Sequence, residues 1–213
     1  NYIKELVEFC GANFEKAYLA SSGTEATETA LKLMRMYGLK LAKKRKPGIV
    51  SIIGNYHGRT MGSFMMSGFP KSKWWIGYHD PNIHFMDFPY PWEITEEKGK
   101  EFFYKQIENL ETKGVDFKND ISGIILETFQ GWGALFYPKT YVKALNDFAK
   151  KNNILICFDE MQAGFYRTGK KFGYEHYDVY PDIICIGKGM SSGLPLSGVV
   201  SSKEILDLPQ QGE

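Results

Sequence analysis

The fold is decided by the stretch ILICFDEMQ at residues 154–162, in which five apolar residues are followed at once by the carboxyls of Asp159 and Glu160. A short apolar run of this kind, bounded by polar residues, is typical of a strand that is buried on both faces. Similar runs occur at residues 49–53, 121–126 and 183–186, and a weaker one at 198–201. We expect each of these runs to be a strand.

Helical patterns separate the predicted strands. Between residues 25 and 46 the apolar side chains recur at the spacing of one helical face, and Ser22 with Glu25 has the form of an N-terminal capping box. The basic residues 43–46 then form a solvated last turn before Pro47 ends the helix. Further helices are predicted at 97–110 and 139–151. Strands that alternate with helices predict an α/β domain with a mainly parallel sheet flanked by helices.

Composition excludes several classes of function. The 213 residues contain 26 Lys and Arg against 25 Asp and Glu, so no overall field recruits nucleic acid or an anionic membrane. No apolar run has the roughly 18–20 residues that span a bilayer, and no signal-peptide pattern occurs. The spacing of Cys10, Cys157 and Cys185 predicts neither a disulfide framework nor a metal site. We expect a cytoplasmic protein.

The segment from residue 64 to residue 94 is dense in proline, glycine and aromatic residues. We expect a long surface excursion that either packs on another subunit or folds back on its own domain. Its candidate anchors on another subunit are Phe88, Trp74, Trp75 and Trp92.

Polar residues follow the predicted strands. Ligands bind beyond the carboxyl ends of parallel strands, so these residues are the candidates for chemistry. They are Tyr56 and His57, Glu127, Asp159 and Lys188. A lysine directly after a buried strand is either ion-paired or has a chemical use.

The turn at Ser22, Gly23 and Thr24 opens the long helix, where unpaired N–H groups favour an anion. A plain helix cap is the alternative. A phosphate turn, an acid, a lysine and an aromatic ring together match the needs of pyridoxal 5′-phosphate (PLP).

Five motifs then carry a resemblance to a known family. They are SGTEA (22–26), YHGRT (56–60), ETFQG (127–131), FDEMQAGFYRTG (158–169) and GKGMSSGLPL (187–196). The motifs occur in the family's order, and Lys188 follows Asp159 by 29 residues. The chain therefore resembles the large, cofactor-binding domain of class III (omega-type) aminotransferases of PLP fold type I.

The resemblance implies a role for each site residue. Lys188 is the Schiff-base lysine, Asp159 pairs with the pyridine nitrogen, and Gln162 bonds the phenolic oxygen of the cofactor. Tyr56 stacks on the ring, and Ser22, Gly23 and Thr24 hold the phosphate. His57 and Glu127 lie beside the cofactor.

Some positions carry alternatives. His57 is equally well a packed strand-end residue, and Arg59 and Arg167 are structural or interface residues. Thr128 stands where the family usually has proline, which weakens the role implied for Glu127. Glu160 is the weaker candidate for the pyridine partner, because alternation turns it away from Asp159.

The activity implied is ping-pong transfer of an amino group, through aldimine and ketimine, from an amino acid or ω-amine to a 2-oxo acid. The motifs are most similar to those of 4-aminobutyrate and acetylornithine aminotransferases. Residues 1–213 correspond to the large domain alone, truncated before and after, and the family implies a homodimer or a dimer of dimers. The alternatives are glutamate-1-semialdehyde aminomutase, which Gln162 disfavours, dialkylglycine decarboxylase, or an inactive PLP-binding protein.

Overall fold

The computed structural model describes residues 1–40 and 47–213. The basic run at 43–46 and the last six residues of the helix predicted over 25–46 lie outside the described residues.

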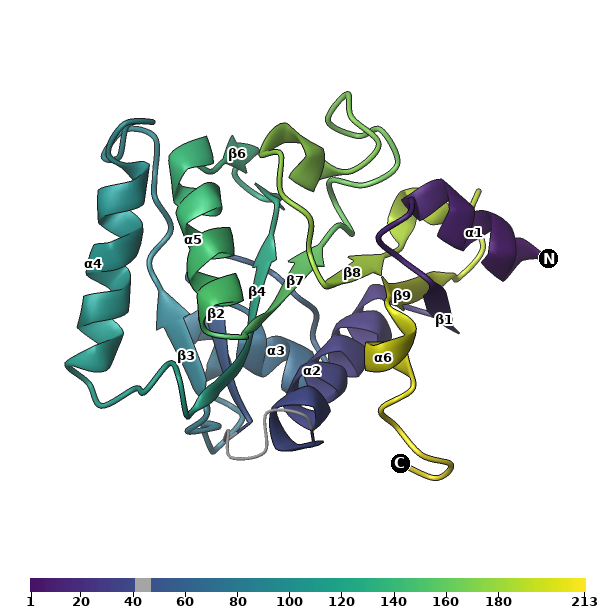
Figure 1. Cartoon of the computed structure of the whole chain (residues 1–213), viewed down its shortest axis with the longest axis horizontal. Helices are drawn as coiled ribbons and strands as arrows, with labels where there is room; N and C mark the ends of the chain where they lie inside the picture. Colours follow the sequence, from purple (N-terminus) through teal and green to yellow (C-terminus); the bar gives the residue numbers. More distant parts are fainter. Residues whose placement is uncertain (41–46) are drawn as a thin grey trace.

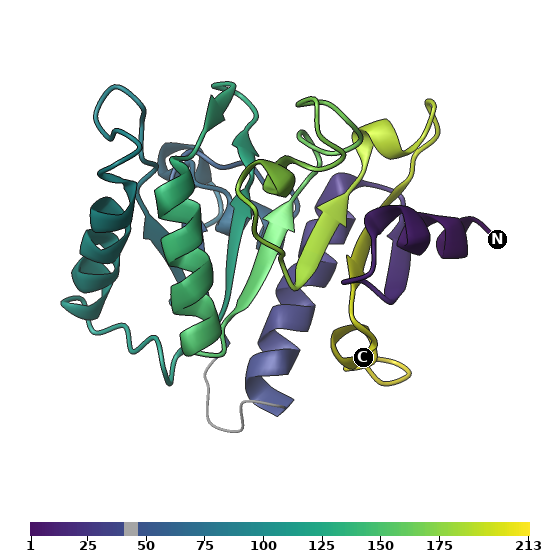
Figure 2. The ribbon, with the colours of Figure 1, turned by 45° about the horizontal axis from the view of Figure 1, so that its top comes forward.

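A seven-stranded sheet forms the centre of the molecule (Figure 1), in the order β1-β9-β8-β7-β4-β2-β3. Its parallel strands are β2 (Gly48–Ile52), β3 (Ile83–Met86), β4 (Ile121–Glu127), β7 (Leu155–Asp159) and β8 (Ile183–Ile186). The strand β9 (Ser197–Ser201) runs antiparallel to β8 and to the edge strand β1 (Lys16–Ala20). Figure 2 shows the arrowheads of β4, β7 and β8 pointing to one edge, where the loops that follow them gather.

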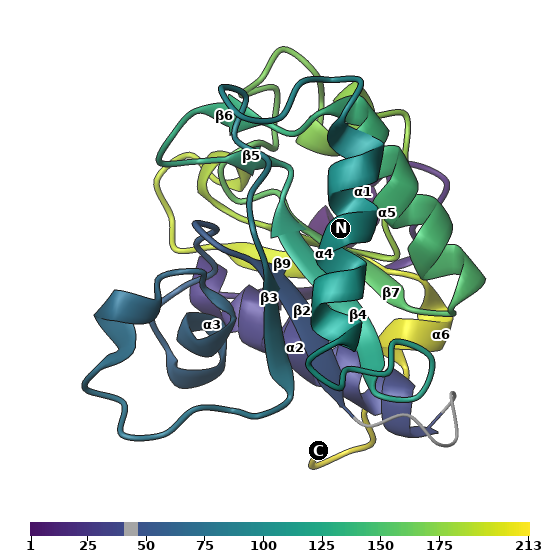
Figure 3. The same cartoon turned by 90° about the vertical axis from the view of Figure 1, so that its left-hand side faces the viewer.

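Helices cover both faces of the sheet. The helix α2 (Gly23–Lys40) and the short α3 (Met61–Met66) lie on one face, and α4 (Gly99–Glu111) and α5 (Lys139–Lys151) pack side by side on the other (Figure 3). The remaining helices are α1 (Tyr2–Cys10) and α6 (Lys203–Leu206), and β5 (Phe129–Gln130) pairs with β6 (Leu135–Phe136) in a small hairpin.

Strand side chains alternate between two separate cores. In β7, Ile156 and Phe158 join the core under α5, whereas Leu155 and Cys157 join the core under α2. Every residue of β7 is therefore buried, which explains why its sequence is a continuous apolar run. The mainly parallel α/β architecture predicted from these runs is confirmed.

The long-excursion prediction for residues 64–94 was partly wrong. The segment contributes the edge strand β3 and a 3-10 turn at Pro70–Lys73. Phe88 is not a surface anchor, because it is buried between Tyr90 and Tyr137 in its own domain. The tryptophans do lie outside, with Trp74 85%, Trp92 68% and Trp75 52% exposed.

Two general features of the described chain bear on function. No helix in residues 1–40 or 47–213 is long and apolar enough to cross a membrane. All three cysteines are buried and free.

Candidate active site

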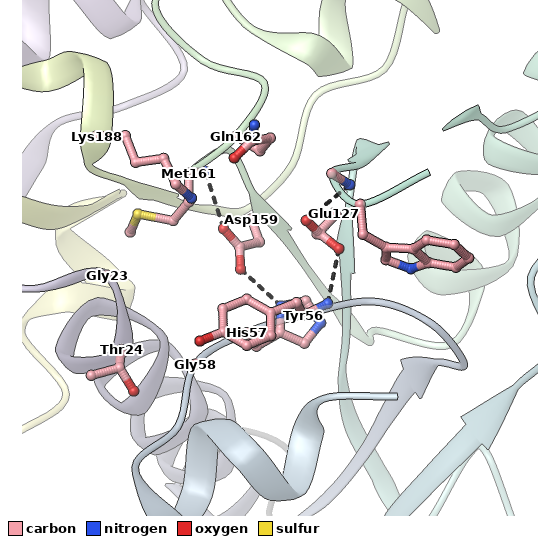
Figure 4. Close-up of a pocket in the computed structure, with 12 residues that line it drawn as sticks. Gly23, Thr24, Tyr56, His57, Gly58, Glu127, Asp159, Met161, Gln162 and Lys188 are labelled. Atoms are coloured by element: carbon pink, nitrogen blue, oxygen red, sulfur yellow. Dashed lines mark hydrogen bonds and ion pairs between the residues drawn. The ribbon is translucent and has the colours of Figure 1, made fainter. Parts of the chain in front are cut away.

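The carboxyl ends of β2, β4, β7 and β8 converge with the first turn of α2 around a cavity of about 510 Å³ (Figure 4). The cavity brings together eight of the nine predicted site residues, and Ser22 is the one that does not line it. Its lining residues are Gly23, Thr24, Tyr56, His57, Gly58, Glu127, Gly131, Trp132, Asp159, Met161, Gln162 and Lys188.

Asp159 is the last residue of β7 and has a buried carboxyl with a fixed orientation. Its Oδ2 lies 2.8 Å from Nδ1 of His57, and its Oδ1 accepts a hydrogen bond from the Met161 amide at 3.1 Å. His57 is held in turn, because its amide donates to Ser67 Oγ at 2.8 Å and its carbonyl accepts from Thr27 Oγ1 at 2.6 Å. His57 is therefore both packed and in direct contact with the candidate pyridine partner.

Glu127 ends β4 directly opposite Asp159 in the strand register. Its carboxyl accepts the Tyr56 amide at 2.8 Å and the Gly131 amide at 3.3 Å. Burial, followed by the nearby charge of Asp159, raises the pKa of Glu127 to about 7. This carboxyl can therefore gain or lose a proton near neutral pH.

The first turn of α2 leaves two amides available for an anion. Glu25 accepts the amides of Ser21 and Ser22, each at 2.8 Å, and these bonds lower the pKa of its carboxyl. In the described part of the chain no acceptor is found for the N–H of Gly23 or of Thr24. The capping role thus falls to Glu25, while Gly23 and Thr24 face the cavity.

Lys188 follows β8 and Gly187 and adopts a left-handed conformation, with φ of +42°. A non-glycine residue in this region costs roughly 1–3 kcal/mol, and functional sites are one place where such residues cluster. Within residues 1–40 and 47–213 its amine makes no ion pair, so the structural alternative for this lysine is not supported. Figure 4 shows Lys188 and Gln162 on one side of Asp159, with Tyr56 and His57 on the other.

Four lining residues were not identified from the sequence: Gly58, Gly131, Met161 and Trp132. Gly58 has φ of +136°, and a Cβ there would lie 2.3 Å from Thr24 Oγ1, so the 56–60 loop fits closely against the α2 turn. Trp132 is fixed by a 2.7 Å hydrogen bond from its Nε1 to the Gly54 carbonyl. Gly58, Gly131 and Met161 lie within the family motifs, but the motifs do not show which distant segments these residues contact.

The other residues considered do not line the cavity. Glu160 is fully buried on the opposite side of β7, as strand alternation predicts, and Arg59 and Arg167 do not line the cavity. No group of three His, Cys, Asp or Glu side chains in the described residues could hold a metal ion.

Comparison with known proteins gives a consistent picture. The family model described as aminotransferase class-III matches residues 1–213. A probable 4-aminobutyrate aminotransferase of Bacillus subtilis is 33% identical and covers 100% of this chain, which spans 49% of that relative. An alanine/serine racemase of Pyrococcus horikoshii is 32% identical, over 96% of this chain and 44% of that protein.

Among solved structures, the taurine:2-oxoglutarate aminotransferase of Bifidobacterium kashiwanohense, in complex with PLP and glutamate, superposes with a TM-score of 0.86 at 28% identity. The match covers 97% of this chain and 47% of that enzyme. The present chain spans about half the length of the curated relatives it matches.

Proposed function

The chain belongs to the class-III aminotransferases, and we propose that the protein carrying it is a PLP-dependent transaminase that moves an amino group from an amino acid or ω-amine to a 2-oxo acid. The observation that carries this proposal is the meeting of four residues in one cavity: the acid Asp159, Lys188, whose amine makes no ion pair with the described residues, and Gly23 and Thr24, whose amides have no acceptor among them.

The residues present fit PLP. The amides of Gly23 and Thr24 would hold its phosphate, Asp159 its pyridine nitrogen and Gln162 its phenolic oxygen, while the 42%-exposed Tyr56 would cover a ring face. When bound, the cofactor withdraws electrons from the substrate carbon that carries the amino group. Lys188 would attach the cofactor through its amine.

Asp159 acts through its charge. A carboxylate next to a pyridine nitrogen favours the protonated ring, and burial strengthens that interaction. The 2.8 Å contact with His57 and the bond from the Met161 amide fix both carboxyl oxygens, so Asp159 loses little free energy in reorganising. Lys188 would take a proton from the substrate carbon and return one.

The proposal also includes the class of amine donor. The motifs and the Bacillus subtilis relative favour an ω-amino acid of the 4-aminobutyrate type as donor. Racemisation is a second candidate, because the Pyrococcus horikoshii racemase is similar to this chain to almost the same degree. Two assays separate these reactions. A transaminase transfers the amino group to 2-oxoglutarate, whereas a racemase removes the optical activity of L-alanine without any oxo acid.

The proposal also covers domain, compartment and assembly. Residues 1–213 form the large domain of a longer cytoplasmic enzyme that works as a homodimer or a dimer of dimers. The assembly is supported by the exposure of Trp74, Trp75 and Trp92, which would bury a large apolar area on a second subunit.

Borohydride reduction of the full-length enzyme with PLP tests the assignment. We expect the added cofactor mass on the peptide containing Lys188. The Lys188→Ala variant should still bind PLP reversibly but lose turnover by several orders of magnitude. Label on another lysine would show that the cofactor site is assigned wrongly.

A further inference from the structure

A second polar pair lies directly behind the one that faces the cavity. The register of β4 and β7 sets Glu127 opposite Asp159, and the next residues, Thr128 and Glu160, turn to the other side. The Glu160 carboxyl is fully buried and accepts three hydrogen bonds, from Thr128 Oγ1 at 2.8 Å, the Gly173 amide at 2.7 Å and the Tyr174 amide at 3.0 Å. The chemistry described above does not use this carboxyl.

Opposing effects act on the protonation of the Glu160 carboxyl. Burial raises the pKa of Glu160 most strongly, the three donors lower it, and the negative charge of Asp159 raises it slightly, so that the pKa is about 7. The other titratable groups that interact with it are Tyr174 and Tyr177, and burial raises the pKa of each, so both stay neutral. No cation of the described residues is among the groups that act on Glu160, so within that part of the chain hydrogen-bond donors alone favour its charged form.

Thr128 is the one side chain among those donors, and it is itself fixed. It is fully buried, and its carbonyl accepts a 2.6 Å hydrogen bond from the hydroxyl of Tyr177. A proline at this position would have no hydroxyl and could not make the bond to Glu160.

We propose that Thr128 is a positioning residue that holds Glu160 as a carboxylate behind Asp159, and that this buried charge helps Asp159 to keep a proton on the pyridine nitrogen of the cofactor. The proposal rests on the proposed function, because it assumes that PLP occupies the cavity. Two adjacent negative charges attract the positive ring more strongly than Asp159 alone, since a nearby charge shifts a proton equilibrium by about one pKa unit.

The dissociation constant of PLP, measured by absorbance titration of the full-length enzyme at pH 7.5 and at pH 9.5, tests the proposal. Thr128→Val keeps the shape and removes the donor, so more Glu160 is protonated at pH 7.5. We expect binding about two- to threefold weaker at pH 7.5 and unchanged at pH 9.5, where Glu160 is charged in both proteins. Glu160→Gln, which is uncharged at every pH, should weaken binding about tenfold at both.

Two further variants separate charge from structure. Thr128→Ser keeps the hydroxyl and should restore the parent values. Ser122→Ala removes another buried hydroxyl, at the start of β4 and far from the strand end that Thr128 follows, and should lower stability without any pH-dependent change in PLP binding. An equal effect of Thr128→Val at both pH values would overturn this inference and leave the proposed function intact. A parent enzyme that binds no PLP would overturn both.

Discussion

Replacing Gly58 by alanine should damage both the fold and the cofactor site. The new Cβ would lie 2.3 Å from Thr24 Oγ1, 2.7 Å from Thr24 Cβ and 2.9 Å from Ser63 Cβ. Thr24 cannot retreat easily, because its Oγ1 lies 2.7 Å from Thr60 Oγ1 and its carbonyl accepts a 2.9 Å hydrogen bond from Ser63. Alanine would in addition have to adopt φ of +136°.

The magnitude follows from two separate costs. The unfavourable backbone conformation costs about 1–2 kcal/mol, and forcing a methyl group into a packed contact costs about 1–3 kcal/mol. We therefore expect Gly58→Ala to lower the free energy of unfolding by about 2–5 kcal/mol. Gly114→Ala is the matched control, because Gly114 has φ of +90° but nothing within 4 Å of its added Cβ. It should lose only the backbone part.

Urea unfolding of the two cofactor-free variants measures this difference, and PLP titration measures its consequence for the site. Gly58→Ala should bind PLP at least about tenfold more weakly, because Thr24 is displaced from the anion turn, whereas Gly114→Ala should bind like the parent. Equal stability of the two variants, or unaltered PLP binding by Gly58→Ala, would refute the close contact between the 56–60 loop and the α2 turn.

Three further predictions concern charge and assembly. Asp159→Asn should bind PLP but barely react, while Asp159→Glu should retain part of the activity; turnover of Asp159→Asn equal to the parent would remove the electrostatic role. Because the pKa of Glu127 is raised to about 7, its contribution to stability is complete below about pH 4.5 and is lost as the pH rises to 7. In urea unfolding, the parent should therefore lose about 3 kcal/mol of stability across that range, and Glu127→Gln should not. An unchanged pH dependence would contradict it. Sedimentation should show the full-length enzyme as a dimer or tetramer, with Trp74→Ala weakening association; a monomer active at nanomolar concentration would exclude a shared site.

The sequence predicted the central strands well because they are buried on both faces, which leaves a continuous apolar run in each. It did not identify β1, whose residues are exposed or only partly buried, including a 55%-exposed Tyr18. It also did not identify β3, which lies at the other edge of the sheet within an aromatic stretch. Edge strands carry a weaker apolar pattern, since one side of each has no neighbour to bury it.

The candidate site could be predicted as far as strand ends and motifs reach. The rule that ligands bind beyond parallel strands placed Glu127, Asp159 and Lys188 at one edge, and the structure brings all three to the cavity. Contacts between distant segments could not be predicted in this way. His57 and Asp159 are 102 positions apart, and their bond depends on the path of the intervening chain.

The pairing of β1 with β9 also bears on how the chain is made. A ribosome produces β1 (residues 16–20) long before β9 (residues 197–201), which is the only strand of the described residues that pairs with β1. The helix α2 packs on β4, β8 and β9, so part of its apolar face also stays uncovered until β9 is made. Nascent chains halted before β9 should therefore keep apolar surface exposed and recruit chaperones. PLP added during translation cannot be bound until nearly all of this segment has emerged.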